Sequence, residues 1–264
     1  MSTPIFTYGL ASKQGSGHDV NRDAVIALTW SDVQQFDGQD VGLFIVADGE
    51  DATDSSISAS QLAVQIVSQE IKKFIFEPGN LTVPDMMTAA IQKAHLQIKA
   101  EVPPDTTTLT AVLLIGNQAY IAHVGDSRAS YAYGKYFIQL TDDHRFLQNL
   151  IELGHYTWEQ VEKGEVYIDN VLYRALGQDE TLEVDVLTEW LGPGSYLLLA
   201  TDGLSSGRRD YVRDMKILSI LQHDTPQLAC EKLIDFAQQS GSTDDISVIV
   251  IKLGQPSAGV VSLS

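Results

Sequence analysis

The sequence has little cysteine and little positive charge, and both shortages narrow the range of functions. Cys230 is the one cysteine in 264 residues, so no disulfide can form within the chain. Basic residues number 17 against 35 acidic ones, for a formal net charge of −18 at pH 7. Such a surface repels nucleic-acid phosphates and anionic lipid headgroups. We therefore expect no nucleic-acid partner and no membrane partner.

Long apolar runs are missing as well. No stretch approaches the roughly 20 apolar residues of a membrane span, and Met1 to Phe6 has no basic segment followed by an apolar one. These features predict a cytoplasmic protein. Hydrophobic residues make up 44% and charged residues 20% of the chain, which is typical of a globular fold. We predict one domain over residues 1–254 and a loose Gly/Ser/Pro-rich tail over 255–264, and the oligomeric state stays open.

The apolar patterns that are present indicate an α+β fold. The continuous run 41–47 predicts a strand buried on both faces. Residues 56–76 and the stretch from Pro84 to the Pro103-Pro104 pair repeat apolar residues at helical spacing, with Leu96 on the apolar stripe of the second helix. From Thr107 onward, four short β-type runs predict an antiparallel meander. A last helix (226–239) and strand (246–253) complete two stacked antiparallel β-sheets covered by helices on both sides, a four-layer αββα sandwich.

Aspartates stand at the ends of several predicted strands. They occur in Asp48-Gly49, Asp202-Gly203 and Asp244-Asp245. Mg²⁺ and similar hard cations bind carboxylate, carbonyl and water oxygens. Asp and Gly are also the usual residues of turns, so a single Asp-Gly pair does not decide between a turn and a ligand.

The order of the motifs resolves this ambiguity, because nearly the whole chain resembles the metal-dependent serine/threonine protein phosphatases of the protein phosphatase 2C type. The resemblance is carried by NRDA (21–24), FIVADG (44–49), Ala59-Ser60, TTLTAVLL (107–114), AYIAHVGDSRA (119–129), LTDDH (140–144), YRALG (173–177), LLLATDGL (197–204) and TDDISVIV (243–250). Each piece is weak alone, but the set in this order is highly specific.

The resemblance implies a set of metal ligands and a reaction. Asp48 would bridge two divalent ions, Mn²⁺ or Mg²⁺, and Gly49 would bind through its carbonyl oxygen. Asp202 and Asp244 would both be ligands of one of these ions, and Asp126 would share a weaker third ion with Asp202. The metals would activate a water molecule that attacks phosphoserine or phosphothreonine in a phosphoprotein substrate.

The first motif departs from the family pattern at two positions. His18 stands where the family has a phosphate-binding arginine, and Arg22 stands where it has an acidic residue. A histidine offers fewer hydrogen bonds to phosphate than an arginine does. We interpret Arg22 and His18 as candidate phosphate contacts, although Arg22 could instead repel the second ion or pair with Asp19. After Gly49, Glu50 and Asp51 replace the family's glycines and are either extra ligands or solvated side chains.

Several histidines and aromatic residues admit structural interpretations. We expect His123 to be a satisfied strand residue, His144 to anchor a turn, and His95 and His155 to lie on the surface. Residues 154–170 correspond to the family's variable flap, in which Tyr156, Trp158 and Tyr167 either contact a peptide or pack against the body.

Two functions from different classes follow from these observations. The first is an active phosphatase, favoured by the intact aspartates. The alternative is a catalytically weak or inactive relative that binds phosphoproteins or partner domains, favoured by His18, Arg22 and the lost glycines.

Overall fold

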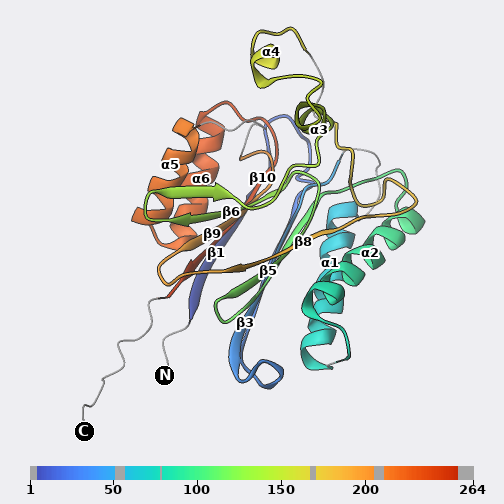
Figure 1. Cartoon of the computed structure of the whole chain (residues 1–264), viewed down its shortest axis with the longest axis vertical. Coiled ribbons are helices and arrows are strands. Elements are labelled where there is room, and N and C mark those ends of the chain that lie inside the picture. Colours follow the sequence, from blue (N-terminus) through green and yellow to red (C-terminus); the bar gives the residue numbers. More distant parts are fainter. Residues whose placement is uncertain (1–4, 51–56, 78, 167–170, 205–210, 255–264) are drawn as a thin grey trace.

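The structure is a computed structural model that describes residues 5–50, 57–77, 79–166, 171–204 and 211–254. Its strands form two five-stranded antiparallel sheets, with the orders β1-β10-β9-β6-β7 and β2-β3-β4-β5-β8 (Figure 1). The strands are β1 (Phe6–Lys13), β2 (Ala24–Val33), β3 (Gln39–Ala47), β4 (Leu109–Ile115), β5 (Gln118–Val124), β6 (Arg128–Tyr133), β7 (Tyr136–Gln139), β8 (Asp185–Trp190), β9 (Tyr196–Ala200) and β10 (Ile246–Leu253). The predicted tail, 255–264, lies outside the described residues.

A pair of helices covers the outer face of each sheet. α1 (Ala59–Phe76) and α2 (Val83–Glu101) pack on the sheet that contains β3, while α5 (Tyr211–His223) and α6 (Pro226–Gln239) pack on the sheet that contains β10 (Figure 1). The predicted αββα order is therefore confirmed. Three shorter helices are η1 (Gln34–Phe36), α3 (Phe146–Glu152) and α4 (Trp158–Glu162). None of the helices in the described part of the chain is long and apolar enough to cross a membrane.

The central strands supply three stacked layers of core. In β3, every residue from Val41 to Ala47 is buried, as the apolar run predicts. Leu43 and Ile45 face the core under α1 and α2, whereas Phe44 and Val46 face the space between the sheets. This alternation follows from the two-residue period of a strand. A strand covered on both faces brings its end, and the aspartate that follows, to a fixed place.

Side-chain caps set the helix starts. The Ser58 hydroxyl accepts a hydrogen bond from the Gln61 backbone N–H in a capping box that begins α1. The Thr82 and Thr225 hydroxyls accept from the backbone N–H of the third residue of α2 and α6, and each of these helices has a proline in its first turn. These three helices thus carry their start signals in the local sequence.

The predicted meander is wrong at its middle. β4 and β5 pair as expected, and so do β6 and β7, but β6 pairs with β9 in the other sheet rather than with β5. The chain crosses between sheets over Gly125, whose φ of +104° favours glycine, and Asp126 lies in this crossing. Strand patterning gives the face that each residue occupies but not the partner strand, so the crossing could not be read from it.

Two expectations on α2 are also wrong. His95, expected on the surface, is 2% exposed, and its Nδ1 accepts a hydrogen bond from the Gly177 N–H at 3.0 Å. Leu96, expected in the apolar stripe, is 62% exposed. Buried Ile91 and Ile98 place the inner face of the helix next to His95. One residue further along, a helix has turned about 100°, which carries Leu96 outward.

Candidate metal centre

A cleft opens where strand ends from both sheets meet. Asp48 directly follows β3, Asp202 lies just after β9, Asp126 lies between β5 and β6, and Asp244 lies just before β10. The cleft has a volume of about 220 Å³ and is lined by His18, Asp48, Gly49, Glu50, Thr108, Asp126, Leu172, Asp202 and Asp244. All five residues predicted to bind metal, and His18 with them, therefore line one cavity.

Three of the carboxylates form a tight group. Asp48, Asp126 and Asp202 each place an oxygen within 4.8 Å of the other two. Burial, reinforced by the neighbouring carboxylates, raises the pKa of Asp48 well above its usual value. Burial also raises the pKa of Asp126 to about 6 and raises the pKa of Asp202. Buried like charges at this spacing favour either a proton or a bound cation.

The backbone of Asp48 is held by the TTLT segment. The Thr107 hydroxyl donates to the Asp48 carbonyl oxygen at 2.7 Å, and the Thr108 N–H donates to the same oxygen at 2.9 Å. In return, the Asp48 N–H donates to the Thr108 hydroxyl at 3.0 Å. The carboxylate thus extends from a strand end whose backbone groups are already bonded.

Two glycines let backbones approach closely around the cleft. A Cβ on Gly49 would lie 2.7 Å from the Arg22 carbonyl oxygen, and one on Gly203 would lie 2.0 Å from the Asp245 carbonyl oxygen. Both contacts are too short for a side chain, so glycine is required for steric reasons. The first approach brings the Asp48 segment to the first motif, and the second brings the Asp202 and Asp244 segments together.

Asp23 shows that the site suits a cation. It is 8% exposed, and its Oδ2 accepts a hydrogen bond from the Thr201 hydroxyl at 2.9 Å. Its Oδ1 is buried without a hydrogen-bond partner among the described residues. Burial raises the pKa of Asp23 to about 7, and the charges of Asp245 and Asp202 act in the same direction. An orphaned carboxylate oxygen beside an all-oxygen donor set fits a hard divalent ion and its water. Asp23 was part of the NRDA motif but not of the predicted ligand set.

The adjacent residues Asp244 and Asp245 have different environments. Asp245 is 3% exposed and accepts hydrogen bonds from the backbone N–H groups of Gly15 and Arg22, both at 2.8 Å. The Asp244 side chain is 44% exposed and lines the cleft. Asp245 thus ties the N-terminal segment to the loop that carries Asp244.

The two candidate phosphate contacts have different positions. The His18 ring lies between acidic groups, with Nδ1 3.1 Å from Asp245 Oδ2 and Nε2 3.6 Å from Asp244 Oδ1. Arg22 is half-buried and is not among the described residues that line the cleft. Its backbone carbonyl accepts a hydrogen bond from the Ser60 hydroxyl. Glu50, which lines the cleft, is exposed and accepts from the Thr106 hydroxyl at 2.7 Å, whereas Asp51 lies outside the described residues.

Comparison with known proteins agrees with this arrangement. The family model described as protein phosphatase 2C matches residues 17–236. The chain belongs to the protein phosphatase 2C family. Among curated relatives, protein phosphatase PhpP of Streptococcus pneumoniae is 33% identical over 153 residues, which cover 58% of this chain and 60% of that protein. Serine/threonine protein phosphatase PstP of Mycobacterium tuberculosis is 29% identical over 94% of this chain and 45% of its own length. These matches therefore span about half of each relative.

A solved structure in the same family extends over the whole fold. The catalytic domain of a serine/threonine protein phosphatase PstP, in complex with two manganese ions, has a TM-score of 0.75 and 26% sequence identity. The match covers 96% of this chain and 100% of that one. The layered architecture of Figure 1 is thus the protein phosphatase 2C fold.

A buried arginine behind the protein phosphatase 2C cleft was not among the predicted site residues. Arg145 directly precedes α3 and is 6% exposed. Its Nε donates to Asp126 Oδ2 at 2.6 Å, and its Nη2 donates to Asp202 Oδ2 at 2.7 Å. The only sequence signal was a basic residue directly after the acidic motif LTDDH. Sequence spacing cannot show that this side chain turns toward Asp126 and Asp202.

A second polar group, centred on the buried His123 and His144, lies directly beside the acidic one. The histidine network consists of His123, His144, Asp185 and Arg174. His144 accepts at Nδ1 from the Gly125 N–H at 3.0 Å, and its Nε2 lies 3.0 Å from Asp185 Oδ2. Arg174 Nη1 donates to the other oxygen of this carboxylate, Oδ1, at 2.7 Å. His123 bonds to the Thr110 hydroxyl at 2.8 Å and to the Asp142 carbonyl at 2.9 Å. The expectation that His123 is a satisfied strand residue is confirmed.

The flap stands away from the body of this protein phosphatase 2C fold. Figure 1 shows α3 and α4 beyond one end of the sandwich. Trp158, in α4, is 37% exposed, His155 is exposed as predicted, and Tyr167 lies outside the described residues. A peptide-contacting role for these residues stays a prediction.

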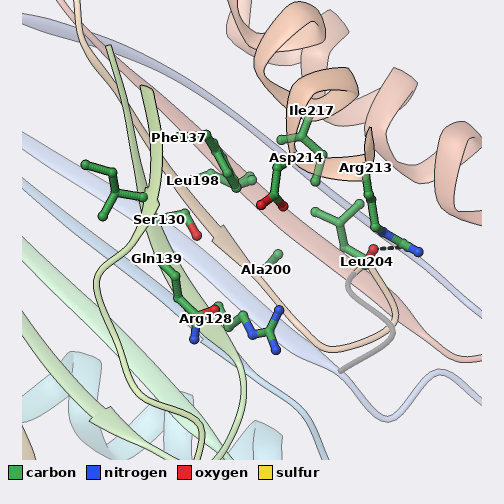
Figure 2. A pocket seen from close by; sticks show the side chains of 11 residues that line it. Arg128, Ser130, Phe137, Gln139, Leu198, Ala200, Leu204, Arg213, Asp214 and Ile217 are labelled. Carbon is green, nitrogen blue, oxygen red and sulfur yellow. Dashed lines mark hydrogen bonds between the residues drawn. The ribbon is translucent and has the colours of Figure 1, made fainter. Parts of the chain in front are cut away.

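Another pocket lies between the β6–β7 hairpin and α5 (Figure 2). It has a volume of about 240 Å³ and is lined by Arg128, Ser130, Phe137, Ile138, Gln139, Leu198, Ala200, Leu204, Arg213, Asp214 and Ile217. Asp214 is the one carboxylate among these described residues, so the pocket lacks the donor set of a hard-ion site.

Proposed function

We propose that this chain hydrolyses phosphoserine and phosphothreonine in proteins and depends on two divalent metal ions, Mn²⁺ or Mg²⁺. The observation that carries the proposal is the group of Asp48, Asp126 and Asp202 at the base of a cleft, with the orphaned Asp23 oxygen nearby. Membership of the protein phosphatase 2C family and the two manganese ions of the related PstP structure support it.

Each protein group has a part in this activity. Asp48, the Gly49 carbonyl, Asp202 and Asp244 would hold the ions, and Asp23 would accept hydrogen bonds from their water. Divalent ions bound there would activate water and neutralise the phosphoryl oxygens. The threonine bonds to Asp48 keep its carboxylate oriented, and Asp245 keeps the Asp244 loop in place.

We also propose that His18 contacts the substrate phosphate. Its ring lines the cleft and lies between the carboxylates of Asp244 and Asp245. Arg22 remains a candidate contact whose backbone is anchored at the cleft edge. Phosphopeptide kinetics of His18→Ala and Arg22→Ala separate the two, because a phosphate contact raises KM or lowers kcat/KM when it is removed.

One assay tests the proposed function. The purified chain is incubated with a phosphothreonine peptide in the presence of Mn²⁺, Mg²⁺, Ca²⁺ or a chelator, and phosphate release is measured. We expect turnover with Mn²⁺ or Mg²⁺ and none with chelator. A chain that binds the phosphopeptide but releases no phosphate with any of the metals would contradict the proposal and favour the regulatory alternative.

The remaining predictions concern the substrate, the location in the cell and the domain organisation. A phosphoprotein substrate follows from the proposed activity. The cytoplasmic location and the single domain over residues 1–254 stay predictions.

A further inference from the structure

A buried arginine is ion-paired to two of the carboxylates that line the cleft. The guanidinium of Arg145 bonds to one oxygen of Asp126 and one oxygen of Asp202, at 2.6 and 2.7 Å. Both aspartates belong to the three-carboxylate group. The arginine side chain is 7% exposed, and Arg145 is not among the described residues that line the cleft. It therefore lies behind the carboxylates rather than on the side that a substrate enters.

The backbone on both sides of Arg145 is held firmly. The segment runs antiparallel to residues 171–173, because Arg145 pairs with Leu172, the Phe146 N–H donates to the Val171 carbonyl, and the Tyr173 N–H donates to the His144 carbonyl. The Asn149 N–H donates to the Arg145 carbonyl at 3.1 Å in the first turn of α3. The guanidinium thus extends from a pinned backbone, unlike a surface arginine that can swing into solvent.

A bound guanidinium and a divalent ion compete for the same oxygens. Asp126 Oδ2 and Asp202 Oδ2 both accept from Arg145, so an ion that bridged these two carboxylates would have to displace a buried charge or lie beside it. Displacing the guanidinium and placing the ion beside it both cost free energy, because like charges at close range repel strongly in the low-dielectric interior of a protein. A guanidinium also keeps its proton throughout the pH range of folded proteins, so it cannot yield its charge to the metal.

We propose that Arg145 is a built-in cation that takes the place of a divalent ion between Asp126 and Asp202, and so limits the cleft to two exchangeable metal ions. The proposal rests on the proposed function of the cleft as a metal site. It replaces the weaker third ion that the family resemblance implies at Asp126. Asp126 then orients Arg145 and balances its charge instead of binding metal.

The test counts the Mn²⁺ ions bound per chain, with equilibrium dialysis against Mn²⁺ followed by elemental analysis. We expect two ions at saturation for the wild-type chain and three for Arg145→Met, because removal of the guanidinium frees both oxygens. Adding Asp126→Asn to Arg145→Met should return the count to two. Arg145→Gln, which keeps a hydrogen-bond donor but loses the charge, should also bind three and guards against a misfolded methionine variant.

Arg128→Met is the matched control. Arg128 is a partly buried arginine that donates two hydrogen bonds to one aspartate outside the cleft, Asp143, at 2.8 and 2.5 Å. Both methionine variants should lower the metal-free melting temperature on the order of 10 °C, because each leaves a buried carboxylate without its partner. Saturating Mn²⁺ should restore more of the loss in Arg145→Met than in Arg128→Met, since only the former gains an ion.

Three results would overturn the proposal. The first is that the wild-type chain binds three Mn²⁺ ions. The second is that Arg145→Gln, although folded by circular dichroism, binds the same number of ions as the wild-type chain. The third is that Arg128→Met also binds an extra ion. Failure of the proposed function looks different, because the wild-type chain would then bind no Mn²⁺. In that case the Arg145 inference stands only if Arg145→Gln binds one ion more than the wild-type chain.

Discussion

Two buried polar regions meet at neighbouring residues, and their hydrogen bonding differs. His144 belongs to the histidine network, in which the ring nitrogens of His123 and His144 all have partners. Arg145, the next residue, belongs to the acidic group, in which carboxylates crowd one another and Asp23 keeps an unpartnered oxygen. A buried network with its bonds satisfied stabilises one conformation, whereas a network with excess negative charge and an unpartnered oxygen is completed by a ligand. The contrast separates structural from functional polar residues within one end of the sandwich.

The largest difference is expected from removing one carboxylate in each region. Asp202→Asn should lower kcat/KM for a phosphothreonine peptide by at least about 100-fold and weaken Mn²⁺ binding, because a ligand charge is lost. Asp185→Asn, the counterpart in the histidine network, should retain Mn²⁺ binding. Metal titration and steady-state kinetics of the two variants side by side measure the contrast. Wild-type turnover in Asp202→Asn would remove this residue from the ligand set.

A smaller effect is expected on stability. His144→Ala should lower the free energy of unfolding by about 1–3 kcal/mol, since the Gly125 N–H and the Asp185 carboxylate each lose a partner. The number of Mn²⁺ ions bound should not change. Urea denaturation with and without Mn²⁺ checks both statements. If Mn²⁺ binding were lost while the unfolding free energy stayed the same, the division between the two regions would be wrong.

The smallest expected effect is the pH dependence of stability and of Mn²⁺ binding. Burial raises the pKa of Asp23 to about 7 and that of Asp126 to about 6, so the metal-free folded chain holds protons that the unfolded chain releases near pH 4. These two groups therefore destabilise the metal-free fold progressively as the pH rises from about 4 to 7. A bound cation needs the charged carboxylates, so the Mn²⁺ affinity should rise as the pH increases through this range.

Calorimetry in two buffers of different ionisation enthalpy measures this proton release. We expect more protons released per Mn²⁺ at pH 6 than at pH 8, and fewer at pH 6 for Asp23→Asn than for the wild-type chain. The histidine network should add nothing, because burial lowers the pKa of His123 to about 4 and also lowers that of His144. Equal release at pH 6 and pH 8 would contradict the raised pKa values.

Short-range sequence patterns account for much of the fold. The continuous apolar run of β3, the capping serine of α1 and the two turn glycines of the hairpins, Gly116 and Gly134, are each decided by neighbours in sequence. The apolar pattern gave no prediction of β1, β2 or α5. The exposed faces of β2 and of α5 weaken the apolar periodicity from which such elements are recognised.

The chemistry of the site can be predicted from the sequence, because aspartates at strand ends, in family order, supply the oxygen donors that a divalent ion needs. Which of these donors remain available depends on how the chain packs. The crossing at Gly125 carries Asp126 to the cleft, and the pairing of Arg145 with Leu172 directs a guanidinium onto Asp126 and Asp202. Such a contact joins residues that are far apart along the chain, and only the packing of the two sheets brings their charges within bonding distance.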